Sequence, residues 1–448
     1  MSTSRSATLT SATPPVPATP ATPAHVLRDR RRPLAWRGLR LGTSVVALHA
    51  GLFIGSRLRR DPILDLFAGR EDDQFAFYER IRTGAENPLP VSATKLRYAT
   101  SHAACSAVLK SRDMGAAPTD PKAQGNIDDN VDLSLLQLNP PDHARLRRVV
   151  APAFSPRAMR RYGTDVEQIT ERLLSEVPAG EPWDLVEKLS GPLPMEMITR
   201  MLGIPDYDQP SFRRYGASIA AALDGVSSLR HAAGILAAQR ATTDIFTRLF
   251  ELRTREPSDD IISEMVQARD RGEIAPEDMV SLATLLLVAG FETTVNLIGS
   301  AVALLMERPG LWHDLTRDPN LAAPIIDETL RFAPPVHLTG RYPLHDTEVA
   351  GQRVAENEPI IVFMAAANRD PEVFERPDEF DITRTNPGDH LSFSAGAHYC
   401  LGAPLARLEA TYALQALAQA APTLRLAGRP VQKKGVVLRG PVSLPVIV

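Results

Sequence analysis

The sequence of 448 residues contains only two cysteines, Cys105 and Cys400, and its formal net charge is only −3. Two cysteines are too few for a disulfide framework, and without a CxxC pair there is no zinc motif, so we expect a reducing, cytoplasmic compartment. Because positive and negative charges nearly balance, nucleic acid is not expected to be the main partner. The hydrophobic share of 44% is sufficient for the large core of a soluble globular protein.

Long apolar runs are also scarce near the N-terminus. Residues 1 to about 24 are almost entirely Ser, Thr, Ala and Pro, and a basic cluster follows, so we expect residues 1–35 to be a disordered extension. The apolar stretch from Leu41 to Gly55 is flanked by basic residues but is shorter than the about 20 residues that a spanning helix requires. It also starts too late, without a cleavage site, for a signal peptide. We expect residues 36–60 to form a short helix, packed or peripheral to a membrane, and residues 61–448 to form a single domain.

Helical periodicity fills most of the remaining chain. It predicts helices at about 61–83, 103–110, 142–153, 157–177, 184–202, 209–223, 230–254, 259–270, 276–307 and 403–418. Strand-like segments are short: 95–100, 347–354, 358–363 and 435–448. An irregular loop rich in Gly, Pro, Asp and Asn lies at 112–132, where a binding site is commonly served. This pattern predicts a mostly α domain with small β-sheets, an α+β fold rather than a doubly wound sheet.

Cys400 lies in a glycine-containing turn just before the expected helix over 403–418. Free amide donors at a helix start, together with the helix dipole, favour a thiolate over a thiol, so the sulfur is a candidate metal ligand. A buried structural cysteine in a tight turn is the ordinary alternative. A nucleophilic role with His398 is disfavoured, because residues two apart in a tight turn rarely align for proton transfer.

The expected helix over 276–307 has an unusual middle. It is apolar from Leu282 to Ala289 and then contains Gly290, Glu292 and Thr293. Glycine costs about 1 kcal/mol relative to Ala in a helix interior, and an unpaired buried carboxylate costs more. Since Ala289 and Thr293 lie on one face, a hollow beside a hydroxyl and a carboxylate could bind a small ligand and supply protons to it. A kink in which Thr293 bonds back to the Ala289 carbonyl is an equal alternative.

Two further pairs of charged residues have helical spacing. Glu328 and Arg331 are three apart, and such a pair contributes little when exposed, so its meaning depends on burial. His143 and Arg147 are four apart on one face and could bind an anionic group such as a carboxylate. A solvated basic face is the alternative for the second pair, because further arginines lie alongside.

Taken together in this order, these motifs resemble those of the bacterial cytochrome P-450 family, the haem-thiolate monooxygenases, and of its soluble actinobacterial type. The resemblance runs from about residue 61 to the C-terminus. Its motifs are the propionate-binding helix from Asn139 to Arg147, the oxygen-binding groove from Ala289 to Thr294, the ExxR pair Glu328 and Arg331, the segment from Asn368 to Asp381, and the haem-ligand loop with Phe393, Gly396, His398, Cys400 and Gly402. One residue departs from the pattern: Ser394 stands where the family usually has Gly, and serine fits there if its φ is negative.

The resemblance implies a cytochrome P-450 fold with haem b between the long central helix and the cysteine loop with its helix. Cys400 would be the axial thiolate ligand of the haem iron, with Phe393 and Gly396 in the loop around it. Glu328 and Arg331 would form a buried structural network rather than a catalytic pair. The residues implied to bind the haem propionates are His143, Arg147, Arg341 and His398.

The same resemblance implies that Glu292 and Thr293 deliver protons to dioxygen on the distal side of the haem. The substrate would lie above the haem, in a pocket lined by Ala289, Gly290, Val336, Leu338 and Val436. The implied reaction inserts one oxygen atom of O2 into a small-to-medium apolar substrate, by hydroxylation or epoxidation. A secondary metabolite such as a polyketide, macrolide or terpenoid is expected, or a fatty acid.

No flavin or ferredoxin module is appended, so electrons from NAD(P)H would arrive through a separate ferredoxin and ferredoxin reductase. Arg145, Arg148 and Arg407 are candidates for contacts with an acidic ferredoxin, and a monomer is expected. The alternative class is a haem-thiolate binding or gas-sensing protein without turnover. Glu292 and Thr293 argue against it, because a sensor needs no proton relay, and they argue equally against a peroxide-using enzyme.

Overall fold

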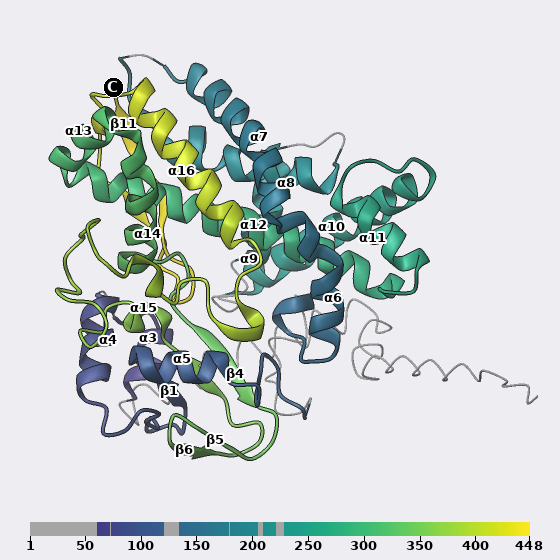
Figure 1. The fold of residues 1–448 in the computed structure, drawn as a ribbon, viewed down its shortest axis with the longest axis vertical. Helices are drawn as coiled ribbons and strands as arrows, with labels where there is room; N and C mark the ends of the chain where they lie inside the picture. The colour runs from purple at the N-terminus through teal and green to yellow at the C-terminus, as the bar shows by residue number, and fades with distance from the viewer. Residues whose placement is uncertain (1–60, 72, 121–133, 179, 205–208, 221–227) are drawn as a thin grey trace, which may run out of the picture.

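A part built of long helices and a part rich in small sheets make up the described chain (Figure 1). The computed structural model describes residues 61–71, 73–120, 134–178, 180–204, 209–220 and 228–448. The expectations for residues 1–60 and for most of the 112–132 loop therefore lie outside the described residues. The helices are α3 (Pro62–Phe67), α4 (Gln74–Thr83), α5 (His102–Lys110), α6 (Asp142–Val150), α7 (Pro156–Ser175), α8 (Pro192–Leu202), α9 (Gln209–Ala220), α10 (Leu229–Arg255), α11 (Ile261–Asp270), α12 (Pro276–Met306), α13 (Pro309–Arg317), α14 (Ala322–Phe332), α15 (Met364–Ala367) and α16 (Ala403–Ala420).

Most helices lie where the sequence pattern predicts them, but α13, α14 and α15 are not among the predicted helices, and two predicted helices are divided. The region 61–83 forms two helices, α3 and α4, because the chain leaves α3 through Gly69, whose φ of +67° is left-handed. The region 184–202 is divided into a π turn at Val186–Ser190 and helix α8, which begins at Pro192. Proline is favoured in the first turn of a helix and disfavoured in its interior, so it separates the two segments.

In the described part of the chain, the strands are short and form four small sheets. The largest has the order β1-β7-β4-β2; β1 and β7 are parallel, with Arg97 opposite Ile360, while β4 is antiparallel to both β7 and β2. A hairpin of β5 and β6, a sheet of order β3-β11-β8 and the pair β9–β10 complete the set. The strands are β1 (Arg97–Ala99), β2 (Met114–Gly115), β3 (Trp183–Asp184), β4 (Thr339–Pro343), β5 (Thr347–Val349), β6 (Gln352–Val354), β7 (Ile360–Val362), β8 (Arg425–Leu426), β9 (Val431–Gln432), β10 (Pro441–Ser443) and β11 (Pro445–Ile447).

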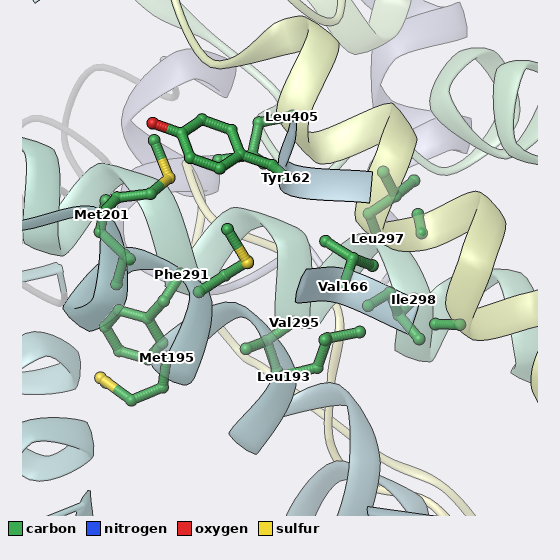
Figure 2. Packing of buried hydrophobic residues seen from close by; sticks show 14 of the residues in the cluster. Tyr162, Val166, Leu193, Met195, Met201, Phe291, Val295, Leu297, Ile298 and Leu405 are labelled. Atoms are coloured by element: carbon green, nitrogen blue, oxygen red, sulfur yellow. The ribbon is translucent and has the colours of Figure 1, made fainter. Parts of the chain in front are cut away.

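Helix α12 passes through the main hydrophobic core. It starts after Ala275 with Pro276 at its first position and with Glu277 and Asp278 in its first turn, where acidic side chains complement the helix dipole. Figure 2 shows its apolar residues packed among those of the neighbouring helices; the labelled ones are Tyr162, Val166, Leu193, Met195, Met201, Phe291, Val295, Leu297, Ile298 and Leu405. Among the described helices, α12 is the one long and apolar enough to cross a membrane, but most of it is buried inside the protein. Its apolar character is therefore that of a core helix.

The strand β10 lies directly against α12, and two glycines allow this approach. A Cβ on Gly299 of α12 would lie 2.5 Å from Cγ of Pro441, and a Cβ on Gly440 would lie 2.5 Å from the Cβ of Asn296. Any larger residue would push the strand away from the helix. The C-terminal part of the chain is thereby held beside the middle of α12.

Candidate active site

The loop before α16 presents Cys400 through a set of backbone hydrogen bonds. The amide of Cys400 donates to the carbonyl of Phe393 at 2.9 Å, and the amide of Tyr399 donates to that of Gly396 at 3.1 Å. Gly396 has a φ of +68°, and a Cβ there would lie 2.4 Å from the carbonyl oxygen of Leu109 in α5. Only glycine fits this position, so the glycine sets how closely the loop approaches α5.

Many protein atoms surround the sulfur of Cys400, although the residue as a whole reaches solvent. The residue is exposed to solvent, yet desolvation raises the pKa of its thiol above the usual value. The amides of Gly402 and Ala403 and the charges of Arg147 and Arg407 lower this pKa, but burial outweighs them. The donors at the start of α16 thus favour the thiolate, as expected, without overcoming the effect of burial. A thiolate here needs a cationic partner of its own, which an iron ion would supply.

Four cationic or titratable side chains gather beside this loop: His143 and Arg147 from α6, Arg341 from β4, and His398. The rings of His143 and His398 have centroids 4.0 Å apart. Burial and the neighbouring arginines lower the pKa of His143, and the same causes lower the pKa of His398 to about 3. The structure thus brings together all four residues implied to bind propionates.

Arg341 is a buried cation whose hydrogen-bond partners among the described residues are all neutral groups. It is almost fully buried, and desolvation lowers its pKa to about 10. Its guanidinium donates to Thr339 Oγ1 at 3.1 Å, to the Gly340 carbonyl at 2.8 Å and to Ser394 Oγ at 3.2 Å. Within the described ranges no carboxylate forms an ion pair with it, and a buried charge without a counter-ion is unfavourable. A ligand that carries two carboxylates and a metal ion would provide a counter-ion for Arg341 and a cationic partner for the sulfur of Cys400. These residues therefore fit haem.

Ser394 occupies a left-handed backbone conformation, with φ of +60°. The condition under which serine is expected to fit, a negative φ, is therefore not met: the turn keeps the conformation that glycine favours, although the residue is serine. The serine adds one contact that glycine could not make, since its hydroxyl accepts the hydrogen bond from Arg341. The residue that departs from the family pattern thus forms a hydrogen bond with Arg341, one of the residues expected to bind the propionates.

The middle of α12 has an accessible spot inside an otherwise buried stretch. Residues 282–288 are all buried, but Ala289 is exposed and Thr293 is half-buried. Thr293 Oγ1 donates to the Ala289 carbonyl at 3.1 Å, and the helix nevertheless runs unbroken from Pro276 to Met306. The hydrogen bond from Thr293 to the Ala289 carbonyl and the accessible helix face at Ala289 therefore occur together, and the helix is not interrupted there. Gly290 is placed differently from Ala289, because a Cβ there would contact Ile198 of α8 at 3.3 Å.

Glu292 is buried, and its carboxylate forms an ion pair with Lys433, which follows β9. Adjacent residues of a helix do not face each other, so Glu292 and Thr293 point in different directions. The structure thus brings the accessible hydroxyl and the buried acid to one turn of α12, but on different faces.

The other residues expected around the substrate divide between two apolar clusters. Val336 packs against a cluster that joins Val288 of α12 with residues of α9 and α10. Leu338 and Val436 belong instead to a cluster with Tyr78 and residues of α3, α4 and α15. The structure therefore groups Val336 with the α12 segment that ends at Ala289, and places Leu338 and Val436 in a separate part of the core.

Glu328 and Arg331 are both buried and form a two-pronged ion pair. Arg331 Nε lies 2.8 Å from Glu328 Oε2, and Nη2 lies 2.6 Å from Oε1. The guanidinium also donates to the carbonyls of Asn368, Pro377 and Glu379. These bonds tie α14 to the segment that leads to the cysteine loop.

Sequence reasoning missed three side chains at these sites. Arg384 is a second buried cation on Glu328, at 3.1 Å, and Lys433 pairs with Glu292. Glu409 of α16 is fully buried, hydrogen-bonded to Thr294, and burial raises its pKa to about 8. Spacing along the chain could not reveal the two cations, because each partner is distant in sequence. A glutamate within an apolar helical run was the one available signal for Glu409.

The three arginines expected at a redox-partner surface differ in their surroundings. Arg145 pairs with Asp142 at 3.0 Å and Asp278 at 3.1 Å. Arg407 pairs with Asp327 at 2.8 Å. Arg148 is exposed. Arg145 and Arg407 are thus already engaged with acids of the same chain.

Comparisons with known proteins identify the family of this chain. The family profile described as "Cytochrome P450" matches residues 91–420. The polyketide biosynthesis cytochrome P450 PksS of Bacillus subtilis is 33% identical over 405 residues, which is 88% of this chain and 97% of that protein. The mycinamicin IV hydroxylase/epoxidase of Micromonospora griseorubida is 37% identical over 321 residues, 70% of this chain and 79% of that protein.

A solved structure shares the fold as well. The crystal structure of Mycobacterium smegmatis CYP164A2 in its ligand-free state has a TM-score of 0.79 and 36% identity, covering 86% of this chain and 99% of that one. The expectations of a mostly α cytochrome P450 fold and of an oxygen-inserting enzyme are confirmed. The chain belongs to the cytochrome P450 family and is a haem-dependent monooxygenase.

Proposed function

We propose that this enzyme hydroxylates or epoxidises an apolar secondary metabolite of the polyketide or macrolide class. The observation that carries this proposal is the cluster of Ile219, Ile235, Val288 and Leu438, with Val336 packed against it, which places apolar side chains beside the residue of α12 that precedes the exposed Ala289. Two relatives support the class, since one is named for polyketide biosynthesis and one for oxidation of mycinamicin IV. Terpenoids and fatty acids are the other apolar classes to compare.

The residues around Cys400 would hold the cofactor. Cys400 would ligate the iron of haem b, and His143, Arg147, Arg341 and His398 would bind the two propionates. The bound haem supplies dioxygen activation, a reaction that the side chains of a protein do not perform. Two electrons and two protons accompany each turnover, so that one oxygen atom enters the substrate and the other leaves as water.

Thr293 and Glu292 would manage those protons. Thr293 Oγ is the accessible hydroxyl on the α12 face that contains Ala289, and the Glu292 carboxylate is the acid next to it in the chain. We assign to Glu292 the uptake of protons and to Thr293 their final placement by a hydrogen bond from its hydroxyl. The electrons would come from NAD(P)H through a separate ferredoxin and ferredoxin reductase in the cytoplasm, with the exposed Arg148 as a contact.

A spectral titration tests the substrate class. Macrolides, terpenoids and fatty acids are added in turn to the ferric holoenzyme, and the displacement of the Soret band is recorded. We expect the largest shift and the tightest binding with a macrolide or another polyketide. A response confined to fatty acids or terpenoids would contradict the proposed class.

The proton-delivery role is tested by Thr293→Ala, with Thr293→Ser as the matched control that keeps the hydroxyl. We expect Thr293→Ala to lower the product formed per NAD(P)H consumed by about 10-fold or more, within reach of what a positioned proton-transfer group supplies. The serine variant should stay near the wild type. Unchanged product yield in Thr293→Ala would remove Thr293 from the relay, while the reduced CO spectrum reports separately on thiolate ligation.

A further inference from the structure

The ion pair between Glu292 and Lys433 joins the centre of α12 to the C-terminal part of the chain. Glu292 is 8% exposed, and the side chain of Lys433 is 20% exposed, so the pair extends from the core toward solvent. Lys433 lies in the connection between β9 and β10, far from α12 in sequence. Its position opposite Glu292 therefore depends on how this connection is held.

Three residues on one face of α12 receive the C-terminal segment. Glu292, Asn296 and Gly299 are four and three residues apart, the spacing of one helical face. Lys433 pairs with Glu292, Gly440 lies against Asn296, and Pro441 lies against Gly299. The segment thus follows the helix face residue by residue, and a shift of the strand would move the lysine.

The backbone around Lys433 is fixed from several sides. Its amide donates to the Gly440 carbonyl at 2.9 Å, and its carbonyl accepts from Arg439 Nη1 at 2.7 Å. The next turn is anchored by Gln74 of α4, whose Nε2 donates to the Gly435 carbonyl at 3.3 Å. A lysine on a fixed backbone needs little reordering to hold its partner, which favours a defined position for the Glu292 carboxylate.

Asn296 adds a second, independent observation. It is fully buried one turn beyond Glu292, and neither its Oδ1 nor its Nδ2 has a hydrogen-bond partner among the described residues. A buried polar group left unsatisfied costs about 1–3 kcal/mol, so native proteins commonly satisfy such groups with internal water. An amide with both ends available beside an ion pair is suited to hold water in contact with Glu292.

We propose that Lys433 is a positioning residue for Glu292, and that Lys433 and Asn296 mark the route by which protons from solvent reach Glu292 between α12 and β10. This inference rests on the proposed role of Glu292 in proton uptake. Only a proton moves along the route: water on the β10 side gives it up, Glu292 takes it, and Glu292 becomes charged again when it passes the proton toward Thr293. Lys433 holds the charged carboxylate in place between turnovers.

The central experiment compares Lys433→Met with Lys434→Met in the ferredoxin-reduced holoenzyme. Methionine keeps the length of the side chain and removes the charge, and Lys434 is the exposed neighbour that serves as the matched control. We expect Lys433→Met to lower product per NAD(P)H by about 5- to 10-fold, a small part of the about 10²- to 10⁴-fold that proton-transfer groups contribute, and to enlarge the solvent isotope effect. Lys434→Met should match the wild type. If the two variants form the same amount of product per NAD(P)H, a ratio called coupling below, the proposal is overturned.

A double-mutant cycle separates this inference from the proposed function. If Glu292→Gln alone leaves coupling unchanged, the proposed role of Glu292 fails. If Glu292→Gln lowers coupling but Lys433→Met does not, only the role of Lys433 fails. We expect both single variants to lower coupling, and the double variant to resemble Glu292→Gln alone, because Lys433 acts through Glu292.

An infrared measurement gives a readout that does not depend on turnover. A buried carboxylate that loses its cation tends to take up a proton, so Lys433→Met should show an additional protonated-carboxyl band at neutral pH. This band should be absent from Lys433→Arg and should disappear in the Glu292→Gln, Lys433→Met double variant, which assigns it to Glu292. A Lys433→Met spectrum without this band would show that Lys433 does not hold the charge on Glu292.

The proposal for Asn296 is tested by Asn296→Leu, which removes the buried amide. We expect this variant to lower the product formed per NAD(P)H while preserving the reduced CO spectrum. An unchanged product yield would exclude the route past Asn296.

Discussion

Two buried glutamates, Glu328 on α14 and Glu409 on α16, are each about 1% exposed but differ in every partner that sets their charge. Glu328 accepts hydrogen bonds from two guanidinium groups, those of Arg331 and Arg384, and from the backbone amide of Asp381. Glu409 has a hydrogen bond with Thr294, while its Oε2 has no partner among the described residues. Burial is the same in both cases, so the neighbouring cations decide which carboxyl stays charged.

The two sites therefore contribute to stability in opposite ways. The Glu328 network connects α14 to the chain before the cysteine loop through charged bonds that lose their value if one member is removed. Glu409 is best accommodated as a neutral acid, because the hydrogen bond with Thr294 favours its charged form less than burial disfavours it. Four substitutions test this difference.

The largest effect is expected from Arg331→Met. This change removes both prongs of the ion pair and leaves three backbone carbonyls without their donor, so we expect a loss of about 3–5 kcal/mol in the free energy of unfolding. Denaturant unfolding of the holoprotein measures it. Arg376→Met is the matched control, because Arg376 forms similar pairs with a half-exposed side chain and should cost below about 1 kcal/mol. Equal losses in the two variants would mean that the burial of Arg331 has no energetic consequence.

Glu409→Gln should change how stability depends on pH. The pKa of Glu409 is raised from the ordinary 4.5 to about 8 by burial. The folded protein therefore keeps a proton that the unfolded chain has already lost, and the stability that this group contributes falls as pH rises from about 4.5 to 8. The neutral amide lacks this dependence, so the variant should become more stable than the wild type by a few kcal/mol above pH 8.

Thermal or denaturant unfolding at several pH values between 5 and 9, roughly the window set by linkage, measures that difference. The exposed Glu187→Gln variant is the control and should keep the slope of the wild type. If Glu409→Gln also keeps that slope, Glu409 is charged in the folded protein, and the contrast with Glu328 disappears.

Arg384→Met should have a smaller effect than Arg331→Met. Glu328 keeps its two-pronged bond with Arg331 when Arg384 is removed, although the carbonyls of Glu375, Arg376 and Glu379 lose a donor. We expect a loss of about 1–3 kcal/mol, because hydrogen bonds to a charged group contribute about that much. A loss as large as that of Arg331→Met would indicate that the two arginines act as a single unit, which the Arg331, Arg384 double variant would test by its non-additivity.

Thr294→Val should have the smallest effect. It removes the hydrogen bond that Thr294 makes with Glu409, and with it an influence that lowers the pKa of the acid. We expect a loss of about 1 kcal/mol and a shift of the pH-dependent fall in stability to higher pH. A shift to lower pH would show that Glu409 gains another partner in the variant.

The local parts of this fold could be predicted from the sequence, because their signals lie within a few residues. Pro276 and the acids that follow it mark the start of α12, and apolar periodicity marks most of its length. Strand pairing could not be predicted in this way. Strands of two or three residues, such as β2 and β9, carry too little pattern, and β1 pairs with β7 across most of the chain.

The candidate site likewise has features that the sequence predicts and features that it does not. Motif order placed Cys400, the cationic cluster and the Glu328 pair in one family pattern, and the structure brings the cluster together. The partner of Glu292 and the second cation on Glu328 depend on contacts between distant segments, which residue spacing does not encode. The backbone conformation of Ser394 could not be predicted for a different reason. The sequence shows which residue stands in the turn, but the surrounding loop determines its φ angle.

The cationic cluster draws its members from separate parts of the molecule. Arg341 belongs to β4 in the four-stranded sheet, whereas His143 and Arg147 belong to α6 in the helical part (Figure 1). A dicarboxylate cofactor bound by all of them would therefore connect the sheet to the helices. Binding free energy is shared by the parts that the ligand joins, so cofactor loss should loosen β4 and α6 together, and cofactor insertion should complete the assembly of the two parts.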